Sequence, residues 1–107
     1  MELTQYQIVL VNLDPTIGSE IKKTRTCVIL SPDEMNRHLS TIVVAPITSK
    51  SKSYPTRVEI KLKKTKGWIV LDQLRTIDRR RIYKGLDQLP LKEVMRVKSI
   101  LKETFVD

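Results

Sequence analysis

The sequence is poor in the residues that usually carry metal ions, cofactors or cross-links. It holds one cysteine, one histidine, one tryptophan and three glycines among 107 residues. Cys27 alone cannot form an internal disulfide or a thiolate zinc cluster, and His38 has no partner at metal-ligand spacing. The glycine-rich phosphate loop and the HExxH, CxxC and calcium-loop motifs are all missing. We therefore expect no metal ion and no cofactor.

Long apolar runs are missing as well. No stretch approaches the roughly 20 apolar residues that span a bilayer, and residues 1–5 (MELTQ) lack the charged-then-apolar layout of a secretory signal. Nothing in the composition requires an oxidising compartment, so the sequence predicts a cytoplasmic protein without a membrane partner. The length suits one domain over residues 1–107, and no linker or internal repeat divides it.

Negative charge is the remaining shortage. The chain has 20 Lys and Arg residues against 12 Asp and Glu, which gives a formal charge of +8. The basic residues are spread along the sequence, and such an excess favours a polyanionic partner. Basic residues that only keep a small protein in solution would give the same numbers. Charge alone does not decide between these interpretations.

Short β-rich segments recur along the chain, at residues 8–13, 27–30, 41–47, 57–62 and 67–71. Residues 57–62 alternate between polar and apolar, which is typical of a half-solvated antiparallel strand. Pro46 falls where a ladder must be interrupted or bent. These features predict a strongly bent antiparallel sheet or a small, partly closed barrel.

Two helices are expected between and after these strands. Residues 31–34 (SPDE) provide a capping hydroxyl, a proline and an acidic first turn, which predicts a short helix ending near Asn36. Residues 90–105 place apolar side chains at helical spacing, and these are Leu91, Val94, Val97, Leu101 and Phe105. The fold class is therefore mainly β with an amphipathic C-terminal helix.

Arg25 and Thr48 are the residues best suited to chemistry on RNA. RNA carries its own nucleophile, the 2′-hydroxyl, so an enzyme needs only to align it, move protons and stabilise the crowded phosphorane. An arginine matches two phosphate oxygens with its planar fork, and a threonine hydroxyl can donate to a third. Arg25 is expected on the exposed loop of residues 14–26, and Thr48 at a strand end. Either residue taken alone is ordinary, so the prediction depends on the fold bringing them together.

Several motifs occur in an order that resembles the MazF/PemK toxin family. Residues 12–20 (NLDPTIGSE), Arg25 and residues 28–32 (VILSP) resemble the opening of that family. Residues 46–49 (PITS), 54–58 (YPTRV) and 72–78 (DQLRTID) resemble its later motifs, over nearly the whole chain.

The resemblance implies an SH3-like barrel of the MazF/PemK/CcdB type that pairs as a homodimer and binds single-stranded RNA in a cleft. It implies cleavage that leaves a 2′,3′-cyclic phosphate and a 5′-hydroxyl, and a cognate antitoxin that blocks the cleft. By position, Arg25 would be the principal catalytic residue and Thr48 its partner at the scissile phosphate. Residues in supporting or RNA-contacting positions would be Ser19, Glu20, Asp72, Gln73 and Arg75.

Other residues are candidates for RNA contacts on their own chemistry. Lys23 adds a positive charge beside Arg25, and Tyr54 in a polar loop could stack on an unpaired base. Trp68 could do the same, although a strand position favours packing. The run of residues 79–81 (RRR) could extend a phosphate track or form a solvated turn.

Two departures from the family pattern keep other functions open. The family usually has glycine before and proline after the arginine in a Gly-x-Arg-Pro pattern, whereas residues 23–26 here are KTRT. A non-enzymatic, gyrase-poisoning toxin of the related CcdB type and a catalytically silent nucleic-acid-binding module are the alternatives. A gyrase poison would not need Arg25 and Thr48 at one site, so their joint presence favours the ribonuclease.

Overall fold

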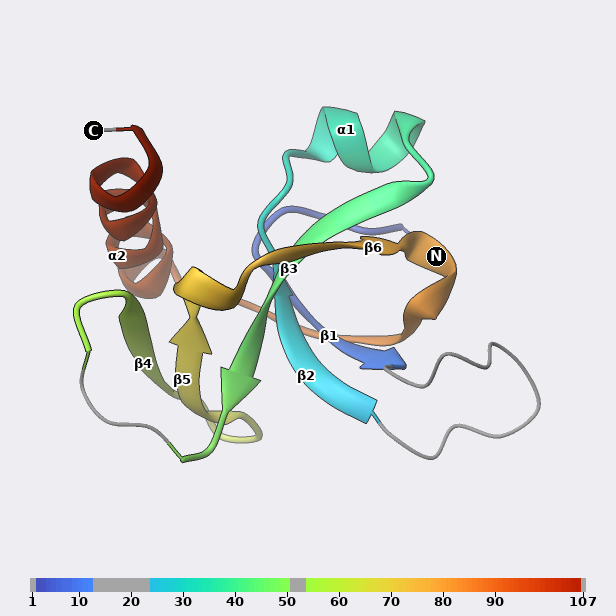
Figure 1. The fold of residues 1–107 in the computed structure, drawn as a ribbon. Coiled ribbons are helices and arrows are strands. Elements are labelled where there is room, and N and C mark those ends of the chain that lie inside the picture. Colours follow the sequence, from blue (N-terminus) through green and yellow to red (C-terminus); the bar gives the residue numbers. More distant parts are fainter. Residues whose placement is uncertain (1, 13–23, 51–53, 107) are drawn as a thin grey trace.

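The computed structural model describes residues 2–12, 24–50 and 54–106, and in these ranges the chain is mainly β (Figure 1). The strands are β1 (Gln7–Asn12), β2 (Thr24–Ile29), β3 (Thr41–Thr48), β4 (Arg57–Lys61), β5 (Lys66–Val70), β6 (Arg75–Asp78) and β7 (Ile82–Gln88). The helices are α1 (Asp33–His38) and α2 (Leu91–Leu101), and the short helical turns are η1 (Leu71–Gln73), η2 (Arg79–Arg81) and η3 (Lys102–Val106).

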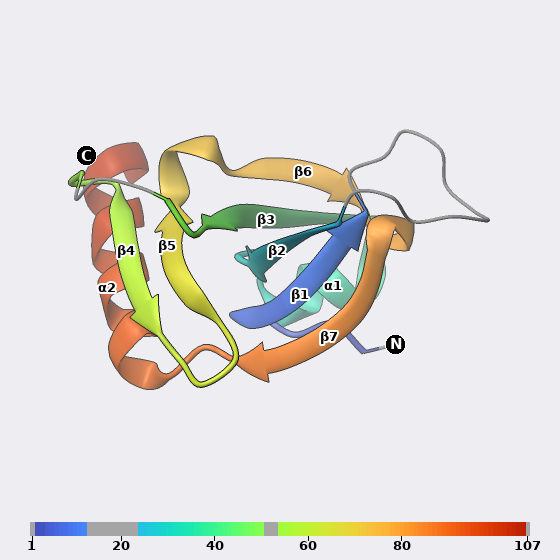
Figure 2. The ribbon, with the colours of Figure 1, turned by 90° about the horizontal axis from the view of Figure 1, so that it is seen from below.

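The strands form one bent antiparallel sheet in which β3 is the central member. The order is β4-β5-β3-β2-β1-β7, and β6 also pairs with β3. Along one edge β3 pairs first with β6, through residues 41–44, and then with β5, through Ile47 and Thr48. The predicted bend at Pro46 is confirmed, because Pro46 precedes the change of partner. Figure 2 shows the result: β4 and β5 turn away toward α2, while β1 and β7 continue the other end of the sheet.

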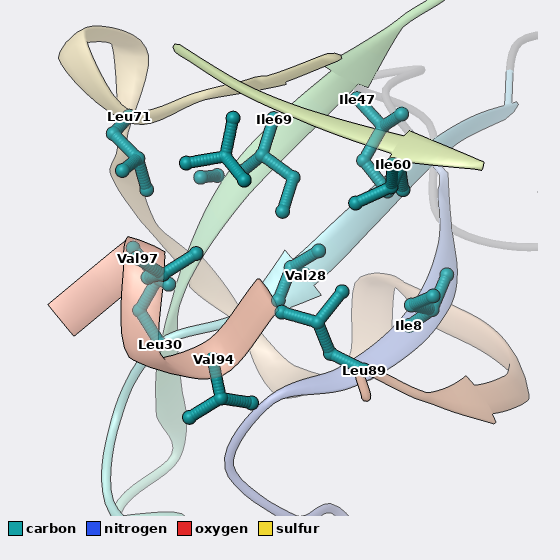
Figure 3. Close-up of a cluster of buried hydrophobic side chains, with 12 residues drawn as sticks. Ile8, Val28, Leu30, Ile47, Ile60, Ile69, Leu71, Leu89, Val94 and Val97 are labelled. Atoms are coloured by element: carbon teal, nitrogen blue, oxygen red, sulfur yellow. The ribbon is translucent and has the colours of Figure 1, made fainter. Parts of the chain in front are cut away.

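Alternation of side chains along the strands gives two buried clusters, one on each face of the sheet. On one face Ile8, Val28 and Ala45 pack with residues of β4, β5 and α2 (Figure 3). The neighbouring residues Val9 and Cys27 point to the other face, with the cluster formed by Leu3, Val9, Val11, Cys27, Ile29, Ile42, Val44, Ile77 and Ile82. The candidate site described below lies at the margin of this second cluster.

Most predicted elements are confirmed, with boundaries shifted by a few residues. The five predicted strands correspond to β1–β5, and the C-terminal helix to α2 followed by η3. Strands β6 and β7 were not among the predicted segments. Most side chains of β7 are exposed at the edge of the sheet, so that strand has no marked apolar pattern. Within the helical stripe, Val94 and Val97 are buried, but Leu91 and Phe105 are 74% and 56% exposed, so their predicted inward positions were wrong.

The prediction for the short helix was partly wrong. Helix α1 runs past Asn36 to His38, and its N-terminus has no side-chain cap. The Ser31 hydroxyl instead hydrogen-bonds the Asn36 side chain and accepts a hydrogen bond from the Val43 amide, 3.1 Å away. Asn36 also donates to the Ser31 carbonyl at 2.9 Å. This buried network ties α1 to the start of β3, a long-range contact that local capping rules do not register.

Replacing Asn36 with alanine is expected to destabilise the fold by about 1–3 kcal/mol, because the Ser31 hydroxyl and carbonyl lose a buried partner. The free energy of unfolding, from urea denaturation, measures the effect. Arg37→Ala, at an exposed position on the same helix, should change it by no more than about 0.5 kcal/mol. Equal stabilities of the two variants would contradict a structural role for the network.

Candidate active site

Arg25 is positioned by the sheet and not by a loop, which corrects the sequence prediction. Strand β2 already begins at Thr24, with Thr24 paired to Asn12 and Arg25 paired to Val11 of β1. The side chain of Arg25 is exposed. Its backbone is therefore held on a β-ladder, which fixes the direction of the guanidinium group better than a loop would.

Arg25 lies at the rim of a small cavity of about 90 Å³. The other polar residues that line it are Gln73, the last residue of η1, and Arg75, the first residue of β6. The remaining lining residues are apolar, and these are Val11, Cys27, Val44, Pro46 and Ile77. Two arginines and one glutamine therefore line the cavity together with apolar residues. Such a combination of convergent polar groups and an apolar lining is typical of a binding site.

Thr48 lies on the same face of β3 as this cavity but does not line it. Val44, Pro46 and Thr48 alternate with inward residues of the opposite cluster, so they share one face. The β2–β3 ladder pairs Cys27 with Pro46 as its last rung. Continued two residues beyond this last pair, the register would place Thr48 beside Arg25; along its other edge β3 pairs Thr48 with Trp68 of β5. The half-buried Thr48 hydroxyl donates to the Lys50 carbonyl at 3.2 Å.

Asp72 and Tyr54 belong to a neighbouring cluster and not to the cavity. The Thr56 hydroxyl donates to Asp72 Oδ1 at 2.9 Å, and Arg57 Nε lies 3.8 Å from the same oxygen. The Arg57 guanidinium also lies 4.8 Å from the centroid of the Tyr54 ring, which is 49% exposed. Sequence reasoning missed Arg57, because the alternation of β4 made it look like one more solvated strand residue. Its side chain is only 18% exposed.

The arginine run at residues 79–81 makes contacts within the protein. Arg79 donates to the carbonyls of Asn36 and Leu39. Arg80 donates two side-chain hydrogen bonds to Asp78, and these bonds lower the pKa of that carboxyl to about 2. Arg81 donates to the Asn12 carbonyl. These contacts favour a structural role for the three arginines, as part of a turn, over a role in binding RNA phosphates.

Burial dominates the chemistry of Cys27 at the floor of the cavity. It raises the pKa of the thiol to about 11, and the nearby charges of Arg25 and Arg75 only partly counter the rise. The pKa of this thiol is higher in the folded state than in the unfolded state. Its contribution to the stability of the fold is therefore fully present below the unfolded-state pKa and is lost as the pH rises through about 11.

Cys27 is therefore expected to react with a disulfide reagent at pH 8 at least a hundredfold more slowly in the native protein than after unfolding in guanidinium chloride. Only about one thiol in a thousand is ionised three pH units below its pKa, against roughly a quarter of unfolded thiols. Absorbance of the released thiolate gives both rates. Native and unfolded chains reacting equally fast would show that the cavity floor is open to solvent.

Three predicted site residues cannot be placed, and His38, which was not predicted to belong to the site, has no role in it. Ser19, Glu20 and Lys23 lie outside the described residues. His38 is exposed at the end of α1. In residues 2–12, 24–50 and 54–106, no three histidine, cysteine or acidic side chains are grouped so that they could hold a metal ion. Among the same residues, no helix is long and apolar enough to cross a membrane.

Comparison with known proteins gives the family. Residues 4–105 match the model of the PemK-like, MazF-like toxins of type II toxin–antitoxin systems. The endoribonuclease MazF of Staphylococcus epidermidis is 37% identical over 101 residues, which cover 88% of this chain and 83% of the relative.

Solved structures share the fold over the whole length. The crystal structure of MazF (form I) from Deinococcus radiodurans has a TM-score of 0.83 and 25% identity, and covers 100% of this chain and 99% of its own. An endoribonuclease of a mycobacterial species, solved with its cognate antitoxin, has a TM-score of 0.83 at 16% identity. The match covers 97% of this chain and 95% of that endoribonuclease. The predicted barrel of the MazF type is confirmed.

The fold and the family match define the class of the protein as a toxin of a type II toxin–antitoxin system. The chain belongs to the PemK/MazF family, as its motifs predicted, and within it to the endoribonuclease toxins. The gyrase-poisoning and catalytically silent alternatives are not favoured.

Proposed function

We propose that this chain cleaves single-stranded RNA, mRNA in particular, at a short sequence and without a metal ion, with Arg25 and Thr48 at the scissile phosphate. The observation that carries the proposal is the convergence of Arg25, Gln73 and Arg75 on one cavity. Thr48 follows two residues after Pro46, which lines the cavity and pairs with Cys27 of β2. Arg25 lies in β2, far along the chain from Gln73 and Arg75 of the adjoining η1 and β6. A merely solvated surface would not require them to meet.

In the proposed reaction the 2′-oxygen forms a bond to phosphorus and the bond to the 5′-oxygen breaks. The 2′-hydroxyl loses its proton and the departing 5′-oxygen gains one, leaving a 2′,3′-cyclic phosphate and a 5′-hydroxyl. Arg25 stabilises the negative charge on the phosphorane oxygens, a role that suits the planar, cationic fork of a guanidinium group. Thr48 donates to the same phosphate, for which its hydroxyl must leave the Lys50 carbonyl.

Supporting roles follow from where the other side chains lie. Gln73 and Arg75 stand at the rim of the cavity, where an amide can both donate to and accept from the edge of a base. The volume of about 90 Å³ corresponds to roughly three water molecules, so the cavity suits part of one nucleotide. Asp72 holds Thr56 and the Arg57 side chain, and we assign it a positioning role. Tyr54 offers an exposed ring for stacking, and Ser19, Glu20 and Lys23 complete the RNA contacts.

The partners and setting of the protein are also proposals. The chain acts as one domain over residues 1–107, in the cytoplasm and as a homodimer. A cognate antitoxin neutralises it; an acidic segment of that partner would complement the charge of +8. The family match over residues 4–105 and the antitoxin complex of the mycobacterial structure support these statements.

The test is incubation of the purified protein with a long single-stranded RNA in excess EDTA, beside Arg25→Ala and Thr48→Ala variants, with the cut ends mapped. Discrete cuts that resist EDTA, disappear in both variants and leave a 2′,3′-cyclic phosphate would support the proposal. Intact RNA at high protein concentration, or variants that cut as well as the parent, would overturn it. Cleavage that EDTA abolishes would contradict the metal-independent reaction.

A further inference from the structure

A second, wider hollow adjoins Arg25. It has a volume of about 490 Å³, and Leu10, Thr26 and Ile47 are among its lining residues. These three residues alternate along their strands with Val11, Cys27 and Pro46, which line the small cavity. The two hollows therefore lie on opposite sides of the sheet end that carries Arg25, and Arg25 lines both.

The wider hollow is one part of a longer depression. It shares Ser49 and Lys66 with a hollow of about 620 Å³ beside Trp68, and it shares Lys64 and Leu86 with one of about 330 Å³ beside Lys84. We call this connected surface the lysine groove and define it by Ser49, Lys64, Lys66, Trp68, Lys84 and Leu86. It runs from Arg25 over the turn between β4 and β5 and onto β7.

The charge of the lysine groove is largely uncompensated. Lys64, Lys66 and Lys84 are exposed, and none of them forms an ion pair with a residue in the described part of the chain. Glu59, at one end, lies 4.0 Å from Lys61, which balances its charge. Among the described residues, the one other acidic residue that lines the hollows is Asp87. The groove therefore presents a row of positive charge beside a half-buried indole.

We propose that the lysine groove binds the stretch of single-stranded RNA that adjoins the scissile phosphate, with the lysines on backbone phosphates and the Trp68 ring against a base. The proposal rests on the proposed ribonuclease function. An RNA strand whose phosphate lies at Arg25 would pass round the sheet end into the groove, because Arg25 lines both hollows. Lysines contribute point charges that tolerate any base sequence, and an aromatic face accepts any base. An acidic peptide would use the lysines but would not need the indole.

The experiment compares the parent with the groove variant Lys64→Gln/Lys66→Gln/Lys84→Gln. The control variant, Lys92→Gln/Arg96→Gln/Lys102→Gln, removes the same charge from α2 and η3, which do not line the groove. The probe is a 2′-O-methyl RNA of the mapped cut sequence with several flanking nucleotides, which binds but cannot be cut. Its fluorescence anisotropy gives Kd between 50 and 200 mM salt.

The groove variant should lose about 2 from the slope of log Kd against log salt, since each lost phosphate contact removes about 0.7 for a single strand. Over a fourfold rise in salt, the parent should then lose about 16-fold more affinity than the groove variant. Trp68, the single tryptophan of the chain, should also change its emission when the probe binds to the parent. The control variant should keep the parent's slope, apart from the smaller effect of net charge.

The outcomes separate this inference from the proposed function. A parent that cuts no RNA overturns the proposed function before the groove is tested. If the parent cuts RNA but both variants share its slope, or if Trp68 emission is unchanged by saturating probe, the lysine groove does not hold the substrate. If the groove variant keeps its RNA affinity but loses that for an acidic peptide, the groove binds a protein partner and the inference is wrong.

Discussion

Arg25→Lys is expected to reduce kcat for RNA cleavage by roughly 10²–10³-fold, although it keeps the positive charge. An ammonium group is a single point charge and cannot span two phosphate oxygens as the guanidinium fork does. Removal of one group that stabilises transition-state charge usually costs about this factor. Arg25 is exposed on the β1–β2 ladder, so the substitution removes no buried contact. The free energy of unfolding should therefore stay within about 0.5 kcal/mol of the parent.

Single-turnover cleavage of a short RNA containing the mapped site measures the chemical step directly. Arg37→Lys, at an exposed arginine on α1, is the matched control and should cut at the parent's rate. A lysine at position 25 that keeps more than a third of the parent's rate would show that charge alone suffices there. Arg25 would then contribute to binding and not to the chemical step.

Gly67→Ala is expected to damage both the fold and the site. Gly67 has a φ of +151°, and a Cβ there would lie 2.5 Å from the Thr48 carbonyl oxygen and 3.1 Å from its carbonyl carbon. The strained backbone conformation alone costs about 1–3 kcal/mol. The clash adds to this cost, because the two nearest atoms belong to the backbone of β3. Any relaxation must move Thr48, so cleavage should fall by more than the fraction of unfolded protein explains.

Gly85→Ala provides the comparison within the same chain. There the new Cβ would meet only the end of the Gln7 side chain, which can rotate away. Urea denaturation and cleavage of the same short RNA should show little change for this variant. If Gly67→Ala were as stable and as active as Gly85→Ala, the close approach of β5 to Thr48 would have no functional importance.

The positions of five strands along the chain were predictable because each of these segments carries its own local signal. Residues 8–13 form a continuous apolar run, and residues 57–62 alternate. Strand β7 gave no such signal, because Lys84, Leu86 and Asp87 are all exposed at the edge of the sheet. The uncapped start of α1 was missed for a related reason. Ser31 bonds to Val43, twelve residues away, and local capping rules do not consider such a partner.

Three residues that line the cavity were predictable from the sequence, but the arrangement of the candidate site was not. Family motifs pointed to Arg25, Gln73 and Arg75, and the structure brings all three to one cavity. The same motifs did not show that Asp72 lies outside this cavity, where its carboxylate contacts Thr56 and Arg57 instead. Neighbouring residues of a short turn such as η1 point in different directions, so sequence adjacency of Asp72 and Gln73 does not imply a shared site.

The pairing of β1 with β7 has a consequence for synthesis of the protein. Gln7 pairs with Gln88 and Val11 with Ile82, so one edge of β1 has no partner until more than seventy further residues are made. At about 5–20 residues per second, that interval lasts roughly 4–15 seconds on the ribosome. During it the apolar edge of residues 7–12 (QIVLVN) is open to pairing with another strand. Strand β7 is therefore synthesised late and covers an edge that is prone to aggregation. A chain interrupted before residue 82 keeps that edge of β1 exposed.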